Sequence, residues 1–393
     1  MADRPVRILM LAPTPYFADR GCHVRIYEEA RALRSRGHDV RIVTYHIGRD
    51  LPDVPVYRIP QIPWYNRLEA GPSWHKLYLD LLLLCKSLLV IPDFRPDLIH
   101  AHLHEGAGIG YVLKKITGLP LVLDYQGSLT GECIDHGFFK AESAVGRCFA
   151  LVEQLIDSCV DRIVTSSGSG AADLVHKWGV PPQRVTPLID AVDTEIFRPA
   201  PTGEGRKMLG IPPDAFVVGY LGLLNRYQGT DLLLESIHLL QQAGIDAHFL
   251  IMGFPEERYR TEARRLGVDG MITFTGKVDY SLAPLMLSAA DIAVTPKLSP
   301  TEANGKIFNY MACALPVIAF DTPVNREVLG DTGVYAEYGS ARSLADRIAE
   351  MARDRAVRER LSRSVRDRAS REHSWETRGR ALEALYRELL SQR

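Results

Sequence analysis

Three polar side chains of different chemistry lie close together, directly ahead of the apolar run 315–320. They are the carboxylate of Glu302, the ammonium group of Lys306 and the amide of Asn309, with Gly305 among them. A carboxylate can accept two hydrogen bonds from hydroxyl groups, and a lysine supplies a compact positive charge. Glu302 and Lys306 would also fit an exposed ion pair four positions apart on a helix, which is worth little. What these groups face depends on the elements that position them.

Two series of short apolar segments alternate with helical patterns along the chain. The segments are rich in β-branched residues and almost continuously apolar, which is typical of strands buried on both faces of a parallel sheet. After the first segment, Val24, Tyr27, Ala30 and Leu33 form one stripe and Gly37 lies where a C-cap belongs, which predicts a helix. The expected strands are VRILMLAP, VRIVTY, DLIHAH, PLVLDYQ and RIVTSS in the first series, and FVVGYLG, AHFLIMG, ITFTG, IAVTP and PVIAF in the second.

A stretch rich in proline and glycine, 184–216, separates the two series of strands. Alternation of strands and helices on both sides of such a linker predicts an α/β chain with two doubly wound domains. In sheets of this kind, ligands bind at the carboxyl ends of the strands, near helix N-termini. The cleft between two such domains is therefore the expected binding site.

The composition is that of an ordinary globular chain. Of 393 residues, 46% are hydrophobic, and 47 Lys and Arg side chains balance 48 Asp and Glu side chains, for a formal net charge of −1. A near-neutral chain has no overall field that attracts nucleic acid, so no nucleic-acid partner is expected. The six cysteines include no C-x-x-C pair, and the apolar stretch at the start is too short for a signal peptide. Both features predict a cytoplasmic protein with reduced cysteines.

A glycine-rich stretch, GAGIG at 106–110, follows one expected strand, and Asp124 ends the next one. This order is similar to a dinucleotide-binding fingerprint. The spacing is G-x-G-x-G, however, and Tyr111 takes the place of the third glycine, where a large side chain would obstruct packing of the helix on the strand. The pattern therefore argues against a dehydrogenase.

His100, His102 and His104 alternate along an expected strand end, so we expect them to point to the same side. Three imidazoles could bind zinc, but no cysteine or second cluster supports a metal, so hydrogen-bonded histidines are the favoured interpretation. No Asp-x-Asp pair is present to hold a divalent ion, and no metal or cofactor is expected. The absence of G-x-S-x-G and G-x-x-x-x-G-K-[ST] argues against a serine hydrolase and a P-loop ATPase.

Two stretches raise the question of membrane contact. Residues 77–91 are strongly apolar, but they include Asp80 and Lys86 and are shorter than the ~20 residues of a membrane span. A buried helix is favoured there, and contact with lipid or a lipid acceptor is the alternative. Residues 353–371 carry eight arginines against three acids. A solvated helix is favoured there, and attraction to an anionic membrane surface is the alternative.

The chain as a whole resembles the retaining glycosyltransferases of family 4, whose GT-B fold has two Rossmann-like domains facing across a cleft. The resemblance covers nearly the whole length, in the order of the family's segments. These segments are RGCHVRIYEEARALRSRGHDVRIVT, RPDLIHAH, RVTPLIDAVDTEIFRP, VVGYLGLLNRYQGTDLLLESI, AHFLIMGFPEE, ITFTGKV, SAADIAVTPKLSPTEANGKIFNYMACALPVIAFDTPVNREVL and HSWETRGRALEALYREL. It implies an acceptor-side domain over 1–195, a donor-binding domain over 196–372, and a final helix, 373–393, that returns to the first domain.

By this resemblance, the stretch before YMACALPVIA binds a nucleotide-sugar donor. Glu302 matches the first of two family glutamates, which holds sugar or ribose hydroxyls, and Gly305 matches the glycine after it. Lys306 matches a lysine found in part of the family, and backbone N–H groups at the start of the following helix would meet the diphosphate. Gly21, in the loop after the first strand, would let the backbone come close to a ligand.

The chain departs from the family pattern at four positions. The second glutamate is replaced by Asn309, which can bind hydroxyls but carries no charge. The arginine and lysine of the family's GRL…KG segment are replaced by Leu223 and Gln228, with Arg226 between them as a candidate substitute. The family histidine near the reacting sugar is replaced by Gln126. The expected catalytic residues are Gln126 and Glu302, and the expected donor-binding residues are Gly21, Arg226, Glu302, Gly305, Lys306 and Asn309.

The favoured hypothesis is a working, metal-independent, retaining glycosyltransferase of hexosyltransferase type with a nucleotide-sugar donor. Its acceptor is left open between a lipid-linked and a small molecule, and peripheral membrane contact is left open as well. The lost cations at 223 and 228 favour a second hypothesis, a non-catalytic homologue of the same fold that binds a sugar ligand or a partner. A sugar-nucleotide epimerase or a phosphorylase of the same fold is the third.

Overall fold

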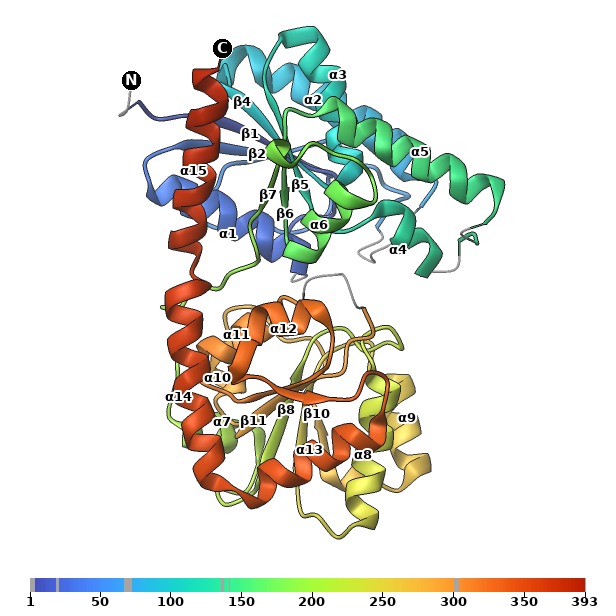
Figure 1. The fold of residues 1–393 in the computed structure, drawn as a ribbon, viewed down its shortest axis with the longest axis vertical. Helices are drawn as coiled ribbons and strands as arrows, with labels where there is room; N and C mark the ends of the chain where they lie inside the picture. Colours follow the sequence, from blue (N-terminus) through green and yellow to red (C-terminus); the bar gives the residue numbers. More distant parts are fainter. Residues whose placement is uncertain are drawn as a thin grey trace. The chain divides into compact units, whose positions relative to one another are not determined.

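The computed structural model describes residues 4–18, 21–66, 73–135, 138–140, 142–299 and 304–392. The chain divides into two compact units. Unit 1 consists of Met1–Ile189 and Trp375–Arg393, and unit 2 of Asp190–Ser374. Each unit is built around a parallel sheet of its own (Figure 1), so the two are described separately.

In the described part of unit 1, seven parallel strands form a sheet in the order β3-β2-β1-β4-β5-β6-β7. Their bounds are β1 Arg7–Ala12, β2 Asp39–Thr44, β3 Val56–Arg58, β4 Leu98–His102, β5 Leu121–Tyr125, β6 Arg162–Thr165 and β7 Val185–Pro187. Both faces of the sheet are covered: along β1, Ile8 and Met10 pack into one apolar cluster, whereas Leu9 and Leu11 pack into another. This alternation is what a strand between two helical layers requires.

The helices of unit 1 form those two layers. They are α1 Gly21–Ser35, α2 Lys76–Phe94, α3 Leu103–Thr117, α4 Leu129–Asp135, α5 Ala144–Cys159, α6 Gly168–His176, the 3₁₀ turn Pro182–Arg184 and α15 Trp375–Ser391. Figure 1 shows α15 beside α1, and their contact is close: a Cβ on Gly379 would lie 3.1 Å from the Cβ of Ala32. On α1, the charged side chains Arg25, Glu28 and Glu29 are buried together with the apolar stripe, and Arg25 contacts Asp124 at the end of β5.

In the described part of unit 2, six parallel strands form a sheet in the order β10-β9-β8-β11-β12-β13. Their bounds are β8 Val217–Leu221, β9 His248–Met252, β10 Ile272–Phe274, β11 Ile292–Thr295, β12 Val317–Phe320 and β13 Val334–Ala336. The strand order reverses between β8 and β11. The connections that leave the two strands at such a point run apart, and a ligand-binding crevice opens at their carboxyl ends.

The helices of unit 2 are α7 Thr202–Leu209, α8 Thr230–Gln242, α9 Glu257–Leu266, α10 Ala283–Leu287, α11 Lys306–Ala312, α12 Pro323–Leu329, α13 Ala341–Arg353 and α14 Arg355–Glu372, with 3₁₀ turns at Asp269–Met271 and Gly330–Thr332. On α14, arginines that the sequence left open as a membrane-attracting face are used inside the unit. Arg366 donates hydrogen bonds to the backbone carbonyls of Phe197 and Ala312, and Arg368 donates to that of Val328.

The two parallel sheets with helices confirm the expected α/β class. The glycines of 106–110 lie inside α3 and let it pack closely on the sheet: a Cβ on Gly110 would be 2.6 Å from the side chain of Leu121. The prediction that three histidines point to the same side was wrong for His104. The backbone takes a left-handed turn at Leu103 (φ 63°), so His104 belongs to α3 and faces a different set of partners.

Candidate active site

Lys306 is the first residue of α11, and its ammonium group lies against the loop that follows β8, at the strand-order reversal of unit 2. Its Nζ donates to the side-chain oxygen of Gln228 at 2.8 Å and to the hydroxyl of Tyr220 at 3.2 Å, and lies 4.4 Å from the centre of the Tyr220 ring. A Cβ on Gly222 would be only 2.9 Å from this Nζ, so the absence of a side chain there makes room for the cation. The structure thus brings together Lys306 and Gln228, which are 78 positions apart.

The hydrogen bonds of Tyr220 fix the direction of this contact. Its hydroxyl donates to the backbone carbonyl of Leu223 at 2.7 Å, which leaves a lone pair of the oxygen to accept from Lys306. Burial raises the pKa of Tyr220, so the hydroxyl keeps its proton. Leu223 therefore takes part through its backbone, while its half-buried side chain adds no charge.

Two hydrogen bonds attach α11 to the sheet, one from within the helix and one from the residues just before it. The buried hydroxyl of Tyr310 accepts a hydrogen bond from the backbone N–H of Leu221 at 2.7 Å, and the buried amide of Asn304 donates to Thr295 at 2.7 Å. These contacts hold Gly305 and Lys306 at the carboxyl ends of β8 and β11. A Cβ on Gly305 would lie 3.8 Å from a carboxylate oxygen of Asp190, an ordinary contact distance.

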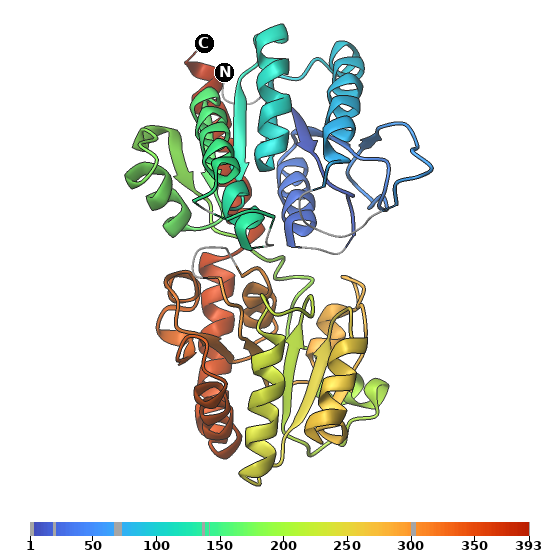
Figure 2. The same cartoon turned by 90° about the vertical axis from the view of Figure 1, so that its right-hand side faces the viewer.

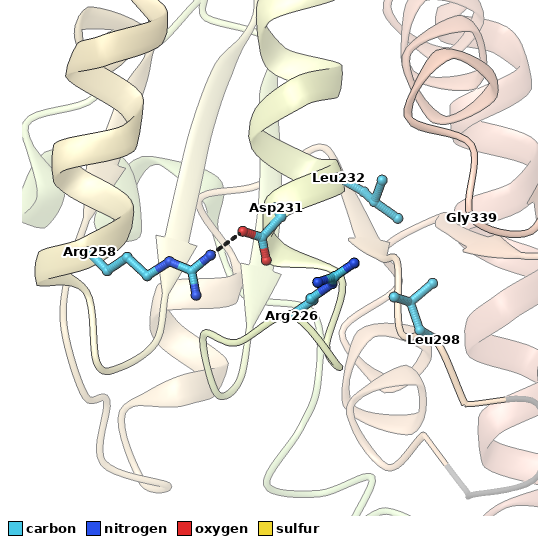
Figure 3. A pocket seen from close by; sticks show the side chains of 6 residues that line it. All are labelled: Arg226, Asp231, Leu232, Arg258, Leu298 and Gly339. Atoms are coloured by element: carbon cyan, nitrogen blue, oxygen red, sulfur yellow. Dashed lines mark hydrogen bonds and ion pairs between the residues drawn. The ribbon is translucent and has the colours of Figure 1, made fainter. Parts of the chain in front are cut away.

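Two of the expected donor-binding residues stand apart from the Lys306 contact. Asn309, on α11, is half-buried, and Arg226 is exposed. Arg226 lines a pocket of about 400 Å³ together with Leu298 and the Asp231–Arg258 ion pair, which is 2.7 Å long (Figure 3). The remaining expected residue of this region, Glu302, lies outside the described residues.

In unit 1, Gln126 follows β5 and is held by Asp124. The Gln126 amide nitrogen donates to the Asp124 carboxylate at 2.7 Å. Asp124 also accepts from Arg25 Nε at 3.0 and 3.1 Å and from His102 Nδ1 at 2.9 Å. Burial alone would raise the pKa of Asp124, but Arg25 and His102 outweigh it and hold the pKa well below its usual range. An ionised carboxylate can only accept, so Gln126 must turn its nitrogen inward and present its oxygen elsewhere.

The same cluster holds the atoms best placed for a metal among the described residues. Glu29, His100, His102 and Asp124 offer ligand atoms within 4.8 Å of one another, all buried. Arg25 already supplies a cation there, since its guanidinium lies 3.1 Å from Glu29 and 2.8 Å from Asp124. Burial lowers the pKa of His100 well below its ordinary value, which keeps that ring neutral. We therefore interpret the cluster as a charge network that orients Gln126.

Gly21 begins α1 of unit 1, and a Cβ added to it would meet none of the described atoms within 4 Å. Packing therefore gives no reason for a glycine at this position. The preceding loop is fixed by buried His23, which accepts from the backbone N–H of Ala18 at 2.9 Å and lies 2.5 Å from the hydroxyl of Thr14. Sequence reasoning did not identify His23, Arg25 or Tyr220. Arg25 contacts Asp124 99 positions away and Tyr220 contacts Lys306 86 positions away, and no short motif records such separations.

Two family models match the chain. "Glycosyl transferase 4-like domain" matches residues 20–188 and "Glycosyl transferases group 1" matches residues 215–354. Similar curated proteins include the D-inositol 3-phosphate glycosyltransferase of Thermobispora bispora, 27% identical over 85% of this chain and 82% of the relative. D-inositol 3-phosphate glycosyltransferase 2 of Catenulispora acidiphila is 29% identical over 76% of this chain and 73% of the relative.

Similar solved structures show the same fold over almost the whole chain. Sucrose-phosphate synthase from Thermosynechococcus elongatus has a TM-score of 0.81 at 19% identity and covers 99% of this chain and 100% of its own. Anabaena HepE in complex with UDP and glucose has a TM-score of 0.77 at 18% identity, with 99% and 100% covered. The fold is thus that of a GT-B glycosyltransferase, with two Rossmann-like domains.

The matches place the chain more narrowly within that class. It belongs to the family 4 glycosyltransferases and is a glycosyltransferase enzyme, as the sequence predicted. Among the described residues, none of the helices has the length and apolar character needed to cross a bilayer.

Proposed function

We propose that this enzyme is a retaining, metal-independent glycosyltransferase that takes a sugar from a nucleotide-sugar donor bound by unit 2. One observation carries the proposal. The position where the family pattern has a lysine, Gln228, holds the ammonium group of Lys306 at 2.8 Å. The cation absent from the loop in sequence is therefore supplied in space by α11. A diphosphate leaving group needs such a partner, because negative charge builds up on it as the sugar departs.

In the proposed reaction, the bond between the anomeric carbon and the donor diphosphate breaks while the acceptor oxygen bonds to the same face of that carbon. The acceptor proton passes to the departing phosphate oxygen, so no side chain has to act as a strong base. Lys306 stabilises the diphosphate, and Gln126 accepts a hydrogen bond from a sugar hydroxyl through the oxygen that Asp124 leaves available. Unit 1 carries the acceptor, and Glu302, Gly305 and Asn309 contribute to the donor site.

The proposal has support of two further kinds. HepE was solved in complex with UDP and glucose and with UDP-glucose, and several relatives are named D-inositol 3-phosphate glycosyltransferases. A UDP-sugar donor and a phosphorylated cyclitol acceptor are accordingly the first pair to assay. Arg226 is the candidate for a second donor contact, because its pocket opens next to the loop that holds Gln228.

Transfer is tested by incubating the enzyme with UDP-glucose, and in parallel with GDP, ADP and dTDP sugars, in the presence and absence of the acceptor. We expect acceptor-dependent release of nucleoside diphosphate that is unaffected by EDTA, with a product whose anomeric configuration by NMR equals that of the donor. An inverted product would refute retention, and loss of turnover with EDTA would refute metal independence. Binding of a nucleotide sugar without release of nucleotide with any donor or acceptor would refute the proposed transfer.

A further inference from the structure

Helix α5 of unit 1 turns acidic side chains inward and apolar side chains outward, unlike an ordinary surface helix. Its acidic residues Glu153 and Asp157 are buried, whereas Leu151 and Leu155 are 66% and 63% exposed. A helix on a soluble core normally turns its apolar stripe inward and its charges outward. The exposed leucines of α5 therefore need an explanation other than packing of the fold.

The reason for the inward acids lies on neighbouring elements. His104 of α3 lies 3.5 Å from the Glu153 carboxylate and 3.4 Å from that of Asp157. Glu153 also accepts from the hydroxyl of Ser128 at 3.1 Å and from the backbone N–H of Thr130 at 2.9 Å. Glu153 and Asp157 therefore occupy much of the inward side of α5, next to the half-buried Ile156, and Leu151 and Leu155 are left facing outward.

Two more helices continue this apolar surface. Figure 2 shows α2, α3 and α5 side by side on one face of the unit 1 sheet, with α3 between the other two. On α2, Leu77, Leu81 and Leu89 are 70%, 59% and 72% exposed, and on α3, Ile116 is 61% exposed. These four side chains, with Leu151 and Leu155, define the apolar face. The sequence favoured a buried helix for 77–91, whereas only one side of α2 is buried.

The structure describes all residues of these three helices, and most of their acids point into unit 1, whereas two of their cations are exposed. The acids Asp80, Glu105, Glu153 and Asp157 each contact a partner inside unit 1: Asp80 accepts from Tyr45 at 2.5 Å and Glu105 from Lys76 at 2.6 Å. Lys115 and Arg147 are exposed. The one exposed acid is Asp93, next to the end of α2. On these three helices, the exposed charges are therefore two cations and one acid, which gives a net positive balance.

We propose that the apolar face of α2, α3 and α5 docks onto the surface of a lipid bilayer that contains anionic lipids. Exposed leucines next to lysine and arginine are what an interfacial helix presents, with the apolar side chains among the acyl chains and the cations at the headgroups. A second copy of this chain is the less favourable occupant, because a two-fold contact would bring together two faces with the same net positive charge. The helices would lie on the bilayer surface without crossing it.

Co-sedimentation with vesicles tests the proposal on the full chain without any donor, so the result is independent of the proposed transfer reaction. Vesicles of phosphatidylcholine are compared with vesicles in which part of it is replaced by phosphatidylglycerol. We expect binding to the anionic vesicles that weakens with added salt. Leu81→Gln and Leu155→Gln should each weaken it about tenfold, from the transfer free energy of one leucine side chain. Lys115→Ala or Arg147→Ala should weaken it about fivefold.

The matched control is Leu282→Gln, because Leu282 is 47% exposed but belongs to unit 2. It should bind vesicles like the unchanged chain. All the substituted side chains are exposed, so thermal melting should show folded variants. The proposal is overturned if the unchanged chain stays in the supernatant with anionic vesicles, or if the Leu81 and Leu155 variants bind as well as the Leu282 variant. It is equally overturned if gel filtration shows a dimer that the Leu81 and Leu155 variants dissociate, since the face would then bind a second copy.

Discussion

Replacing Lys306 by alanine should weaken the binding of nucleoside diphosphate by about thirtyfold. Removing a charged partner of a bound anion costs ~2–5 kcal/mol, and we take the lower end because Lys306 is only half-buried. A cost of ~2 kcal/mol corresponds to a factor of about thirty in the dissociation constant. The fold should tolerate the change, since Tyr220 keeps its hydrogen bond to the carbonyl of Leu223 and the backbone N–H of Gln228 keeps its bond to Asn225.

Isothermal titration of UDP, GDP, ADP and dTDP into the unchanged chain and the variant measures this effect. Lys207→Ala is the control for a general loss of positive charge, because Lys207 is an exposed cation on α7 of the same unit. A sharper test moves the cation back to the loop. The tip of Gln228 is 2.8 Å from Nζ of Lys306, so a lysine at 228 can reach the same place when 306 is alanine.

The double variant Lys306→Ala with Gln228→Lys should therefore recover part of the lost affinity. Gln228→Lys alone should gain little, because two ammonium groups at this distance repel each other. If Lys306→Ala binds every nucleotide as tightly as the unchanged chain, this lysine does not contact the diphosphate and the site lies elsewhere. If the single variant is weakened but the double variant recovers nothing, the relocation of the cation is wrong.

Three further substitutions test other parts of the enzyme. Gly21→Val should lower turnover and leave the melting temperature nearly unchanged, because a Cβ there meets no described atom within 4 Å; a collapse of stability would make Gly21 a packing residue. Gln126→Ala should lower kcat and leave diphosphate binding intact, and weakened binding would contradict its assignment to the reacting sugar. Burial would lower the pKa of His104, but Asp157 and Glu153 outweigh it and raise the pKa. The contribution of protonated His104 to the free energy of unfolding is then complete below pH ~6.5 and is lost as pH rises through the folded pKa. His104→Gln should therefore lower the free energy of unfolding more at pH 6 than at pH 9. A difference that does not change with pH would refute this.

The strands of both sheets that run through the cores could be predicted from their continuous apolar character. The short edge strands β3, β7 and β13 were not expected, although β10, which is equally short and also at a sheet edge, was. On α1, the stripe Tyr27, Ala30 and Leu33 indicated the face on the sheet. The burial of Arg25 and Glu29 could not be predicted from it, since Arg25 joins Glu29 to Asp124, which lies 99 positions after Arg25 in the sequence.

In the candidate site, too, local patterns could be predicted and contacts between distant residues could not. Lys306 could be singled out from a local pattern and a family resemblance, and its neighbour Gln228 could be recognised as a departure. That the two residues touch, with Tyr220 beneath the ammonium group, depends on how β8 and β11 are ordered in the sheet. Arg226 was a candidate because of its nearness in sequence to Gln228, and only the structure shows that it lines a pocket with Leu298 and the Asp231–Arg258 ion pair (Figure 3).

The position of α15 also has a consequence for biosynthesis. Unit 1 is interrupted in the chain by the whole of unit 2, and Leu382, Leu385 and Tyr386 of α15 complete one of its apolar cores. On the ribosome, unit 1 would emerge first but would lack this helix until residues 190–374 had been made. The apolar core that α1 shares with α15 would be incomplete during that interval, whereas unit 2 could fold as one continuous segment. The second half of the chain is therefore expected to reach its native state before the first.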